Sequence, residues 1–291
     1  MSVNPPRPRG PSLNALRAFE SAARLAGFSK AAEELSVSAG AIAQHVKTLE
    51  DWAGAPLFER HAKGLTLTVL GHETLAPLTD AFDQMGIAVQ SLRARAQPDR
   101  IHIAALPSIA QLWLSPRLPA IRAQMPDLNL SITALEAPPN LVRDPFDLSI
   151  FLTAEKGVTL EEDAIFPVCA PHLAGLIKTV DDLQNLPCLS DATWSYDWQT
   201  WLDFAAPRRR IPLHGPVFSL YALAVQEAVN GAGVLMAHST LIRPQLADGY
   251  LVNPLGPKVE TGRAITLETR PGPASKPLKR LCELLACEGR L

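Results

Sequence analysis

The hydrophobic pattern of this chain changes at Gln97 and Pro98. Before these residues, apolar side chains recur every three to four positions, which is the spacing of amphipathic helices. After them, short apolar runs alternate with helical segments, a pattern typical of a mostly parallel sheet with helices on its faces. A chain of 291 residues can hold both kinds of unit. We therefore expect a small helical unit followed by a larger α/β unit.

The helical region begins with three short helices and a hairpin. Ser12, Ser29 and Ser38 each stand where the first turn of a helix needs a capping side chain. Two short extended pieces then flank Lys63 and Gly64, as in a β-hairpin wing. This order of elements predicts a winged helix-turn-helix, a module that binds DNA.

The third of these helices divides into a buried and an open face. At about 100° per residue, Val46 and Leu49 fall within about 40° of Ile42, which predicts a buried stripe. The opposite side would face a DNA groove and carries Gly40, Gln44, Lys47 and Asp51.

A long helical run follows from His72 to about Ala96. Its apolar positions keep a spacing of three to four residues, namely Leu75, Leu78, Phe82, Met85 and Val89. A single helix cannot bury such a stripe by itself, so we expect a partner helix from a second subunit.

The overall composition narrows the kind of protein. With 27 Lys and Arg against 29 Asp and Glu, the net charge is −2, so DNA contacts would depend on local placement of cations. We find no signal peptide and no run of about 18 apolar residues, which predicts a cytoplasmic protein without membrane contact. The four cysteines lack the paired short spacings of zinc sites, so we expect free thiols, no metal and no cofactor.

Enzyme motifs are missing from the sequence. There is no phosphate-binding loop with its lysine, no G-x-S-x-G elbow, no H-E-x-x-H pair and no glycine triplet for a dinucleotide. We therefore expect that the protein is not an enzyme. A solute-binding protein is another alternative, but that class would need an export signal and would not begin with a winged helix.

Residues 13–71 resemble the N-terminal motif of LysR-type transcriptional regulators. The matching positions are Leu13 to Phe19, Ala22, Ala23, Phe28 to Leu35, Ile42, Val46, Leu49, Glu50, Gly54, Pro56 to Phe58, Arg60, Leu67, Thr68 and Gly71. The stretches NALRAFESAAR and WSYDWQTW look most like the branch that includes glycine-cleavage and β-lactamase regulators. The rest of the chain resembles the family more loosely.

The resemblance implies an α/β protein with a winged helix-turn-helix, a long linker helix and a two-lobed effector domain similar to periplasmic binding proteins. The implied ranges are 1–11 for a flexible arm, 12–71 for the DNA-binding domain, 72–97 for the linker helix and 98–291 for the effector domain. Lobe I would take residues 98–167 and 253–291, and lobe II residues 168–252. The strands Ile165–Cys169 and Tyr250–Pro254 would cross between the lobes.

The resemblance also implies partners. These are double-stranded DNA, a small-molecule effector, a second copy of the chain that forms a homodimer through the linker helix, and two such dimers in a homotetramer. RNA polymerase is a further partner that the resemblance suggests.

By their place in the family motif, certain residues are expected to contact DNA: Ser29, Lys30, Ser38, Ala39, Gly40, Ala43, Gln44, Lys47, Thr48, Arg60 and Lys63. Many family members carry glutamine at the site of Ala39 and serine at the site of Ala43, so two polar base readers are missing here. We therefore expect specificity to rest more on DNA shape, the wing and dimer spacing than on the first helical turn. Gly40 either lets the backbone approach DNA closely or avoids a clash within the module.

In this family the effector lies between the lobes, near the helix start that follows the first strand. The residues expected to contact it are Pro107, Ser108, Ile109, Glu136, Phe151, Thr153, Trp194, Phe218 and Ser219. Ser108 could instead be an ordinary helix cap. Phe151 stands where this branch often has arginine, which would make the cleft more apolar. We therefore expect a small carboxylate effector with an apolar part.

Two alternatives stay open for the function. One is a degenerate LysR-like dimer with weak or shape-based DNA binding, because Ala39 and Ala43 are what such a loss would leave. The other is a cytoplasmic small-molecule-binding protein without a regulatory role. The effector, the operator and the direction of regulation do not follow from the sequence.

Overall fold

The computed structural model describes residues 10–61, 64–97, 99–154 and 157–288. The chain forms two compact units, unit 1 (Met1–Val89) and unit 2 (Gln90–Leu291). Most of the predicted arm 1–11 lies outside the described residues. No helix in the described part of the chain is both long and apolar enough to cross a membrane.

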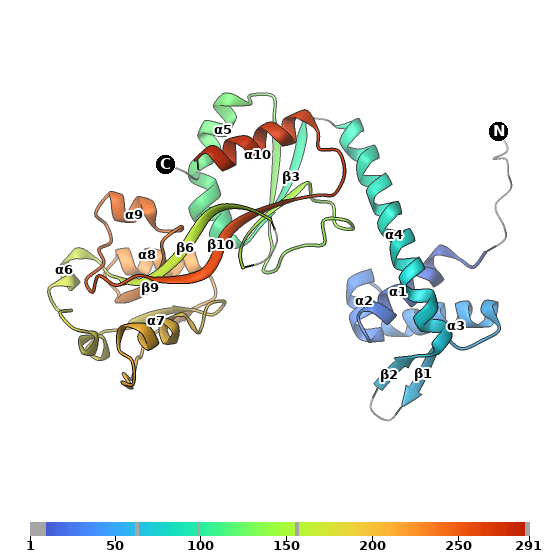
Figure 1. Ribbon diagram of the computed structural model, residues 1–291, viewed down its shortest axis with the longest axis horizontal. Helices are drawn as coiled ribbons and strands as arrows, with labels where there is room; N and C mark the ends of the chain where they lie inside the picture. The colour runs from blue at the N-terminus through green and yellow to red at the C-terminus, as the bar shows by residue number, and fades with distance from the viewer. Residues whose placement is uncertain (1–9, 62–63, 98, 155–156, 289–291) are drawn as a thin grey trace. The chain divides into compact units, whose positions relative to one another are not determined.

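Unit 1 holds the three helices and the wing (Figure 1). Its elements are α1 (Leu13–Arg24), α2 (Phe28–Leu35), α3 (Ala39–Ala53), β1 (Phe58–His61), β2 (Gly64–Leu67) and the larger part of α4 (Val69–Ala96). β1 and β2 pair in antiparallel register, with Phe58 opposite Leu67. The winged helix-turn-helix expected from the sequence is confirmed.

Two serine side chains cap the starts of α1 and α3 by accepting hydrogen bonds from backbone amides. Ser12 Oγ accepts a hydrogen bond from the amide of Ala15 at 3.2 Å. Ser38 Oγ accepts one from the amide of Ala41 at 3.1 Å. Both predicted caps are confirmed, because each hydroxyl satisfies an amide that the first turn leaves without a helical partner.

The predicted cap at Ser29 is wrong. α2 begins one residue earlier, at Phe28, and Gly27 takes the cap position without a side-chain hydrogen bond. The ring of Phe28 packs edge-on against Phe58 of the wing, with centroids 5.5 Å apart. This aromatic contact draws Phe28 into the first turn, so Ser29 is a helical residue and not the cap.

Small alanines of α1 and α2 and aliphatic side chains of α3 form the core of unit 1. The predicted stripe of α3, made of Ile42, Val46 and Leu49, is buried and therefore confirmed. The other buried apolar residues are Ala15, Ala18, Phe19, Ala22, Ala31, Ala32 and Leu57.

α4 begins at Val69, three residues before the expected start at His72. The reason is a cap at Thr68, whose Oγ1 accepts a hydrogen bond from the amide of Gly71 at 3.0 Å. The same hydroxyl donates to the carbonyl oxygen of Pro56 at 3.0 Å. Thr68 therefore caps α4 and at the same time bonds to the segment that precedes the wing.

Unit 2 is built on one eight-stranded sheet with the order β4-β3-β5-β10-β6-β9-β7-β8. The strands are β3 (Arg100–Ala105), β4 (Asn129–Ala134), β5 (Leu148–Thr153), β6 (Val158–Val168), β7 (Cys188–Asp191), β8 (Val217–Phe218), β9 (Val234–His238) and β10 (Val259–Thr269). β4, β3 and β5 are parallel to one another, and so are β9, β7 and β8. The long antiparallel strands β10 and β6 join these two parallel groups.

The strands that connect the two groups differ in part from those expected. The first expected crossover strand, Ile165–Cys169, lies largely within β6, but Tyr250–Pro254 forms only an isolated bridge between Val252 and Cys169. The Asn253 side chain accepts hydrogen bonds from the amides of Leu255 and Gly256. These hydrogen bonds turn the chain just before Pro257 and end the extended segment. The returning strand is therefore β10. The exact lobe boundaries stay a prediction.

Helices cover both faces of the sheet. They are η1 (Ile109–Leu114), η2 (Ser115–Arg117), α5 (Leu118–Gln124), α6 (Pro171–Ala174), η3 (Val180–Asn185), α7 (Asp197–Ala205), α8 (Tyr221–Val229), α9 (Arg243–Ala247) and α10 (Lys276–Glu288). In β9, Val234 and Met236 pack in the core with α7, while Leu235 and Ala237 pack in the core with α8. This alternation agrees with Figure 1, where α7 and α8 lie on opposite sides of β9.

All four cysteines are free, with Cys169 and Cys188 buried. Burial raises the pKa of the Cys169 thiol to about 11 and that of the Cys188 thiol to about 12, so both are neutral at physiological pH. Among the residues that the structure describes, no group of three or more His, Cys, Asp or Glu side chains is placed to hold a metal ion.

Candidate DNA-binding surface and effector cleft

The open face of α3 borders a hollow in unit 1. Gly40, Ala43, Gln44 and Lys47 line this hollow together with side chains from α2 and β1. Gly40, Gln44 and Lys47 are exposed, and Ala43 is half-buried. The buried stripe lies on the other side of the helix, so these four residues are free to meet DNA.

Two other polar side chains of α3, Glu50 and Thr48, make hydrogen bonds to the protein backbone. Glu50 Oε1 accepts hydrogen bonds from the amides of Leu57 and Phe58 at 2.8 and 3.2 Å, which holds the wing against the helix. The Thr48 hydroxyl donates to the carbonyl oxygen of Gln44 at 2.9 Å. Of the expected readers on this face, Gln44 and Lys47 therefore keep their polar groups free for DNA.

Gly40 has open space around its Cα. A Cβ built there would meet only Ser38 Oγ, at 3.9 Å, and the backbone is not in the left-handed region. The idea that Gly40 avoids a clash within the module is therefore wrong. Glycine within a helix costs up to about 1 kcal/mol relative to alanine. Of the two explanations, close approach to DNA is the one that remains.

The other expected DNA contacts lie at the starts of α2 and α3 and in the wing. Those at the helix starts are all exposed, namely Ser29, Lys30, Ser38 and Ala39. Arg60 lies in strand β1. Lys63 falls outside the described residues.

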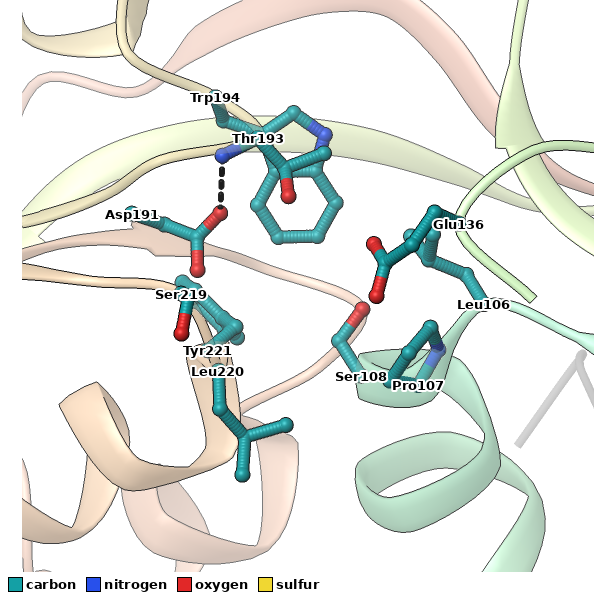
Figure 2. A pocket seen from close by; sticks show the side chains of 10 residues that line it. All are labelled: Leu106, Pro107, Ser108, Glu136, Asp191, Thr193, Trp194, Ser219, Leu220 and Tyr221. Atoms are coloured by element: carbon teal, nitrogen blue, oxygen red, sulfur yellow. Dashed lines mark hydrogen bonds between the residues drawn. The ribbon is translucent and has the colours of Figure 1, made fainter. Parts of the chain in front are cut away.

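A pocket opens in unit 2 where the strands of two parallel pairs end, β3 with β4 and β7 with β8 (Figure 2). Residues 106–108 follow β3, Glu136 follows β4, Asp191 ends β7, and Ser219 follows β8. In open α/β sheets, ligands bind outside the carboxyl ends of the strands. The pocket is narrow in this structure, with about 10 Å³ of space for the centre of a water-sized group.

Five of the nine expected effector contacts line this pocket. They are Pro107, Ser108, Glu136, Trp194 and Ser219. Ser108 is not a helix cap, because its side chain makes no capping hydrogen bond. Its Oγ is buried and has no hydrogen-bond partner in the described part of the chain.

The other four expected contacts do not line this pocket, and their role in effector binding stays a prediction. Ile109 and Phe151 are buried in the main core of unit 2, and Phe218 packs against that core. Thr153 lies in β5, paired with Ala264 of β10. Phe151 therefore does not make the cleft apolar. The physical reason is that β5 is buried along nearly its whole length, so its apolar run gives no sign of which side faces the cleft.

Five of the ten residues that line the pocket were not expected from the sequence. The missed residues are Leu106, Asp191, Thr193, Leu220 and Tyr221. Asp191 was the one that could have been found, because it is an acidic residue at the carboxyl end of a short parallel strand. Its Oδ1 accepts a hydrogen bond from the amide of Thr193 at 2.8 Å.

Next to Trp194, His238 is clamped between two buried carboxylates. His238 Nδ1 is 2.7 Å from Asp163 Oδ2, and Nε2 is 2.9 Å from Asp197 Oδ2. Both ring nitrogens lie close to carboxylate oxygens, which favours the imidazolium form, but only the contact of Nδ1 with Asp163 has hydrogen-bond geometry. The ring centroids of Trp194 and His238 are 4.0 Å apart. This cluster therefore supports one wall of the pocket.

The pKa values of the cluster shift in the directions that keep its charges. Burial by itself would lower the pKa of His238, but the hydrogen bond to Asp163 and the negative charge of Asp197 raise it above its ordinary value. Burial by itself would raise the pKa of Asp197, but His238 and Arg263 lower it. Arg263 Nη2 lies 2.9 Å from Asp197 Oδ1. Two carboxylates thus face one imidazolium and one guanidinium, and the charges cancel.

Comparisons with known proteins agree with this organisation. The family model "Bacterial regulatory helix-turn-helix protein, lysR family" matches residues 13–72, and "LysR substrate binding domain" matches residues 94–290. The glycine cleavage system transcriptional activator of Escherichia coli is 34% identical over 257 residues, covering 84% of this chain and 83% of that protein. The transcriptional activator AmpR of Rhodobacter capsulatus is 33% identical over 256 residues, covering 86% of this chain and 88% of that protein.

Solved structures show the same fold. CrgA, a LysR-type regulator from Neisseria meningitidis, matches with a TM-score of 0.56 at 19% identity, covering 96% of this chain and 99% of that one. The effector domain of AmpR from Pseudomonas aeruginosa matches with a TM-score of 0.56 at 20% identity, covering 66% of this chain and 96% of that one.

A winged helix-turn-helix, a long helix and an α/β unit with a pocket at its strand ends define a DNA-binding regulator that carries an effector domain. The chain belongs to the LysR-type transcriptional regulators. Its relatives regulate transcription and are not enzymes, which confirms the expected family, fold class and general function.

Proposed function

We propose that this protein binds operator DNA as a homodimer, with α3 in the major groove and the wing beside it, and that a small molecule in the pocket of unit 2 controls this binding. The observation that carries the proposal is the division of α3. Ile42 faces the core, while Gln44 and Lys47 are exposed in the hollow on the other face. The pocket at the strand ends supports the second part.

The dimer contact would run along α4. Met85, Val89 and Leu92 recur at the spacing of one helix face, and all three are exposed. A second copy of such a helix buries an apolar stripe of this kind. A homotetramer, a contact with RNA polymerase and a cytoplasmic location remain predictions from the family.

Footprinting on the DNA upstream of the protein's own gene tests the proposal. A working dimer is expected to protect two half-sites, separated by one or more helical turns of about 10 base pairs. A degenerate dimer would give no protection beyond that of unrelated DNA.

Substitutions on α3 should separate phosphate contacts from base contacts. Lys47→Ala is expected to weaken binding to all DNA sequences and to reduce the slope of log K against log salt by about 1, because one phosphate contact is lost. Gln44→Ala is expected to reduce the difference in binding free energy between operator and unrelated DNA only slightly. The loss should be smaller than the roughly 1–3 kcal/mol of a bidentate base contact, because DNA shape carries most of the specificity. Titrations with operator and unrelated DNA at several salt concentrations measure both effects.

Thr74→Ala is the matched control for these two variants, because Thr74 lies in α4 outside the expected DNA contacts, and its hydroxyl donates to the carbonyl oxygen of Leu70 within the helix. It should leave affinity and salt slope close to those of the wild type. If Gln44→Ala abolished discrimination and left nonspecific affinity unchanged, direct readout by Gln44 would be the better account.

Gly40→Ala is expected to stabilise unit 1 and to weaken DNA binding. The added methyl group meets open space, so the free energy of unfolding should rise by up to about 1 kcal/mol through helix propensity. The same methyl group would stand between α3 and the DNA. Thermal unfolding and DNA titration of the same preparation measure the two effects, and unchanged affinity would contradict the role given to Gly40.

A further inference from the structure

The charged side chains that line the pocket are all acidic. Glu136 and Asp191 contribute carboxylates, and no lysine, arginine or histidine stands among the described residues of the lining. The remaining polar groups include the hydroxyls of Ser108, Thr193 and Ser219. An anionic ligand would meet repulsion here, while a cation would be attracted.

Neither carboxylate has a cationic partner within the described chain. Asp191 is only 6% exposed, and among the described residues its carboxylate accepts a hydrogen bond from the amide of Thr193. Glu136 is exposed at the other side of the pocket and makes no ion pair with a described residue. A carboxylate that is removed from water is costly unless a donor or a cation compensates it. The pocket thus has two acidic positions that a bound cation would satisfy.

The cations closest in the fold are already neutralised. His238, whose ring packs at a tilt against Trp194, is held between Asp163 and Asp197. Arg263 is paired with Asp197. Because the charges of this cluster cancel, it does not compensate the acidic lining of the pocket.

The hydroxyl of Ser108 is an independent sign of a ligand. The residue is 4% exposed, and its Oγ lacks a hydrogen-bond partner in the part of the chain that the structure describes. Figure 2 shows this hydroxyl and the carboxylate of Glu136 pointing toward one another at the pocket, with Asp191 on the other side. Buried hydroxyls are nearly always hydrogen-bonded, so a polar group of a ligand is expected beside this one.

An ammonium group matches this set of partners. It has three N–H donors and no acceptor, which matches a lining with two carboxylates and one hydroxyl that lacks a partner. The indole of Trp194 adds an aromatic face that favours a cation. The space open to the centre of a water-sized group is only about 10 Å³, so in this structure the pocket has room for one small group such as an ammonium head.

We propose that the effector is a small molecule with a protonated primary amine, which binds between Glu136, Asp191 and Ser108 Oγ beside Trp194. This inference rests on the proposed role of the pocket as the effector site. It replaces the carboxylate group that the sequence led us to expect.

Three probes of nearly equal size and different charge test the proposal on the full-length protein. They are ethanolamine as the cation, ethylene glycol as the neutral analogue and glycolate as the anion. Saturation-transfer NMR with each probe is expected to give a Kd for ethanolamine at least about tenfold lower than that for ethylene glycol, and no binding of glycolate. High salt should weaken the binding of ethanolamine and not that of ethylene glycol.

Charge-neutral variants locate the amine. Asp191→Asn is expected to weaken ethanolamine binding about tenfold, because a buried partner loses its charge, and Glu136→Gln about threefold, because that side chain is exposed. Glu162→Gln is the matched control, since Glu162 is exposed in the same unit and does not line the pocket. Thermal unfolding of each variant checks that the fold is kept.

The outcomes separate this inference from the proposed function. If glycolate binds better than ethanolamine and Ser108→Ala weakens it, the pocket remains the effector site and the amine is wrong. If ethanolamine fails to bind at about 100 mM, where even a four-atom amine of modest efficiency would bind, the amine is also wrong. If ethanolamine binds and neither acidic variant changes its Kd, it binds elsewhere, and both the amine site and the effector role of the pocket are overturned.

Discussion

Replacing His238 by alanine is expected to lower the free energy of unfolding of unit 2 by about 3–5 kcal/mol, because the substitution breaks a buried ion pair and leaves uncompensated charge. Asp163 would lose its cationic partner at 2.7 Å and keep hydrogen bonds from Thr240 and Thr261, and Asp197 would keep its ion pair with Arg263. Unfolding can be followed by tryptophan fluorescence, since four of the five tryptophans lie in unit 2.

The matched control for this variant is His214→Ala. His214 is exposed in the same unit, so its replacement is expected to change stability by less than about 0.5 kcal/mol. A loss below about 1 kcal/mol for His238→Ala would mean that water or a rearranged side chain takes over the role of the imidazolium.

The same cluster makes the stability of unit 2 depend on pH. The pKa of His238 is raised in the folded protein, so its contribution is complete below the unfolded value of about 6.5 and is lost as the pH rises through the folded value. Between these two values the free energy of unfolding should fall by about 1.4 kcal/mol per pH unit. Urea unfolding from pH 6 to pH 9 measures this slope, which His238→Ala should remove while His214→Ala keeps it.

The fold of unit 1 could be predicted well from the sequence because its signals are local. The stripe of Ile42, Val46 and Leu49 lies within two turns of one helix, and the cap at Ser38 acts on an amide three residues away. The start of α2 at Phe28 could not be predicted from local signals, because Phe28 contacts Phe58 of the wing, which is distant in sequence. Local patterns thus identify the elements, and tertiary contacts set their ends.

The pocket of unit 2 could be predicted only in part. Ser108 and Trp194 were found through the family resemblance, but Asp191 enters the lining because β7 lies in the same sheet as β3, which is not visible in either strand alone. The ion cluster is a similar case. Asp163 and His238 are 75 residues apart in sequence, and only the pairing of β6 with β9 brings them together.

Glycines are a further place where residue type alone is ambiguous. Gly40 and Gly71 both lie in helices of unit 1, and neither has a left-handed backbone. The structure separates them by what surrounds each Cα. Space is open at Gly40, whereas a Cβ at Gly71 would lie 2.3 Å from the carbonyl oxygen of Leu57.

Gly71→Ala is therefore expected to destabilise unit 1 by about 2–3 kcal/mol, since the added methyl group would overlap a backbone atom that no rotamer change can move. Relief would require α4 to shift away from Leu57, whose carbonyl oxygen accepts the hydrogen bond from the amide of Thr68. That shift would also disturb the cap at Thr68, which joins the wing to α4.

For a unit of this size, the expected loss corresponds to a Tm lower by at least about 8 °C in calorimetry of the full-length protein. Affinity for DNA should fall as well, because the position of the wing depends on the same contact. Gly40→Ala makes the same chemical change at an open site and is expected to raise the Tm of the same unit. If both alanine variants unfolded at the wild-type temperature, the Leu57 carbonyl would have room to move, and close packing of α4 against it would not be the reason for glycine at position 71.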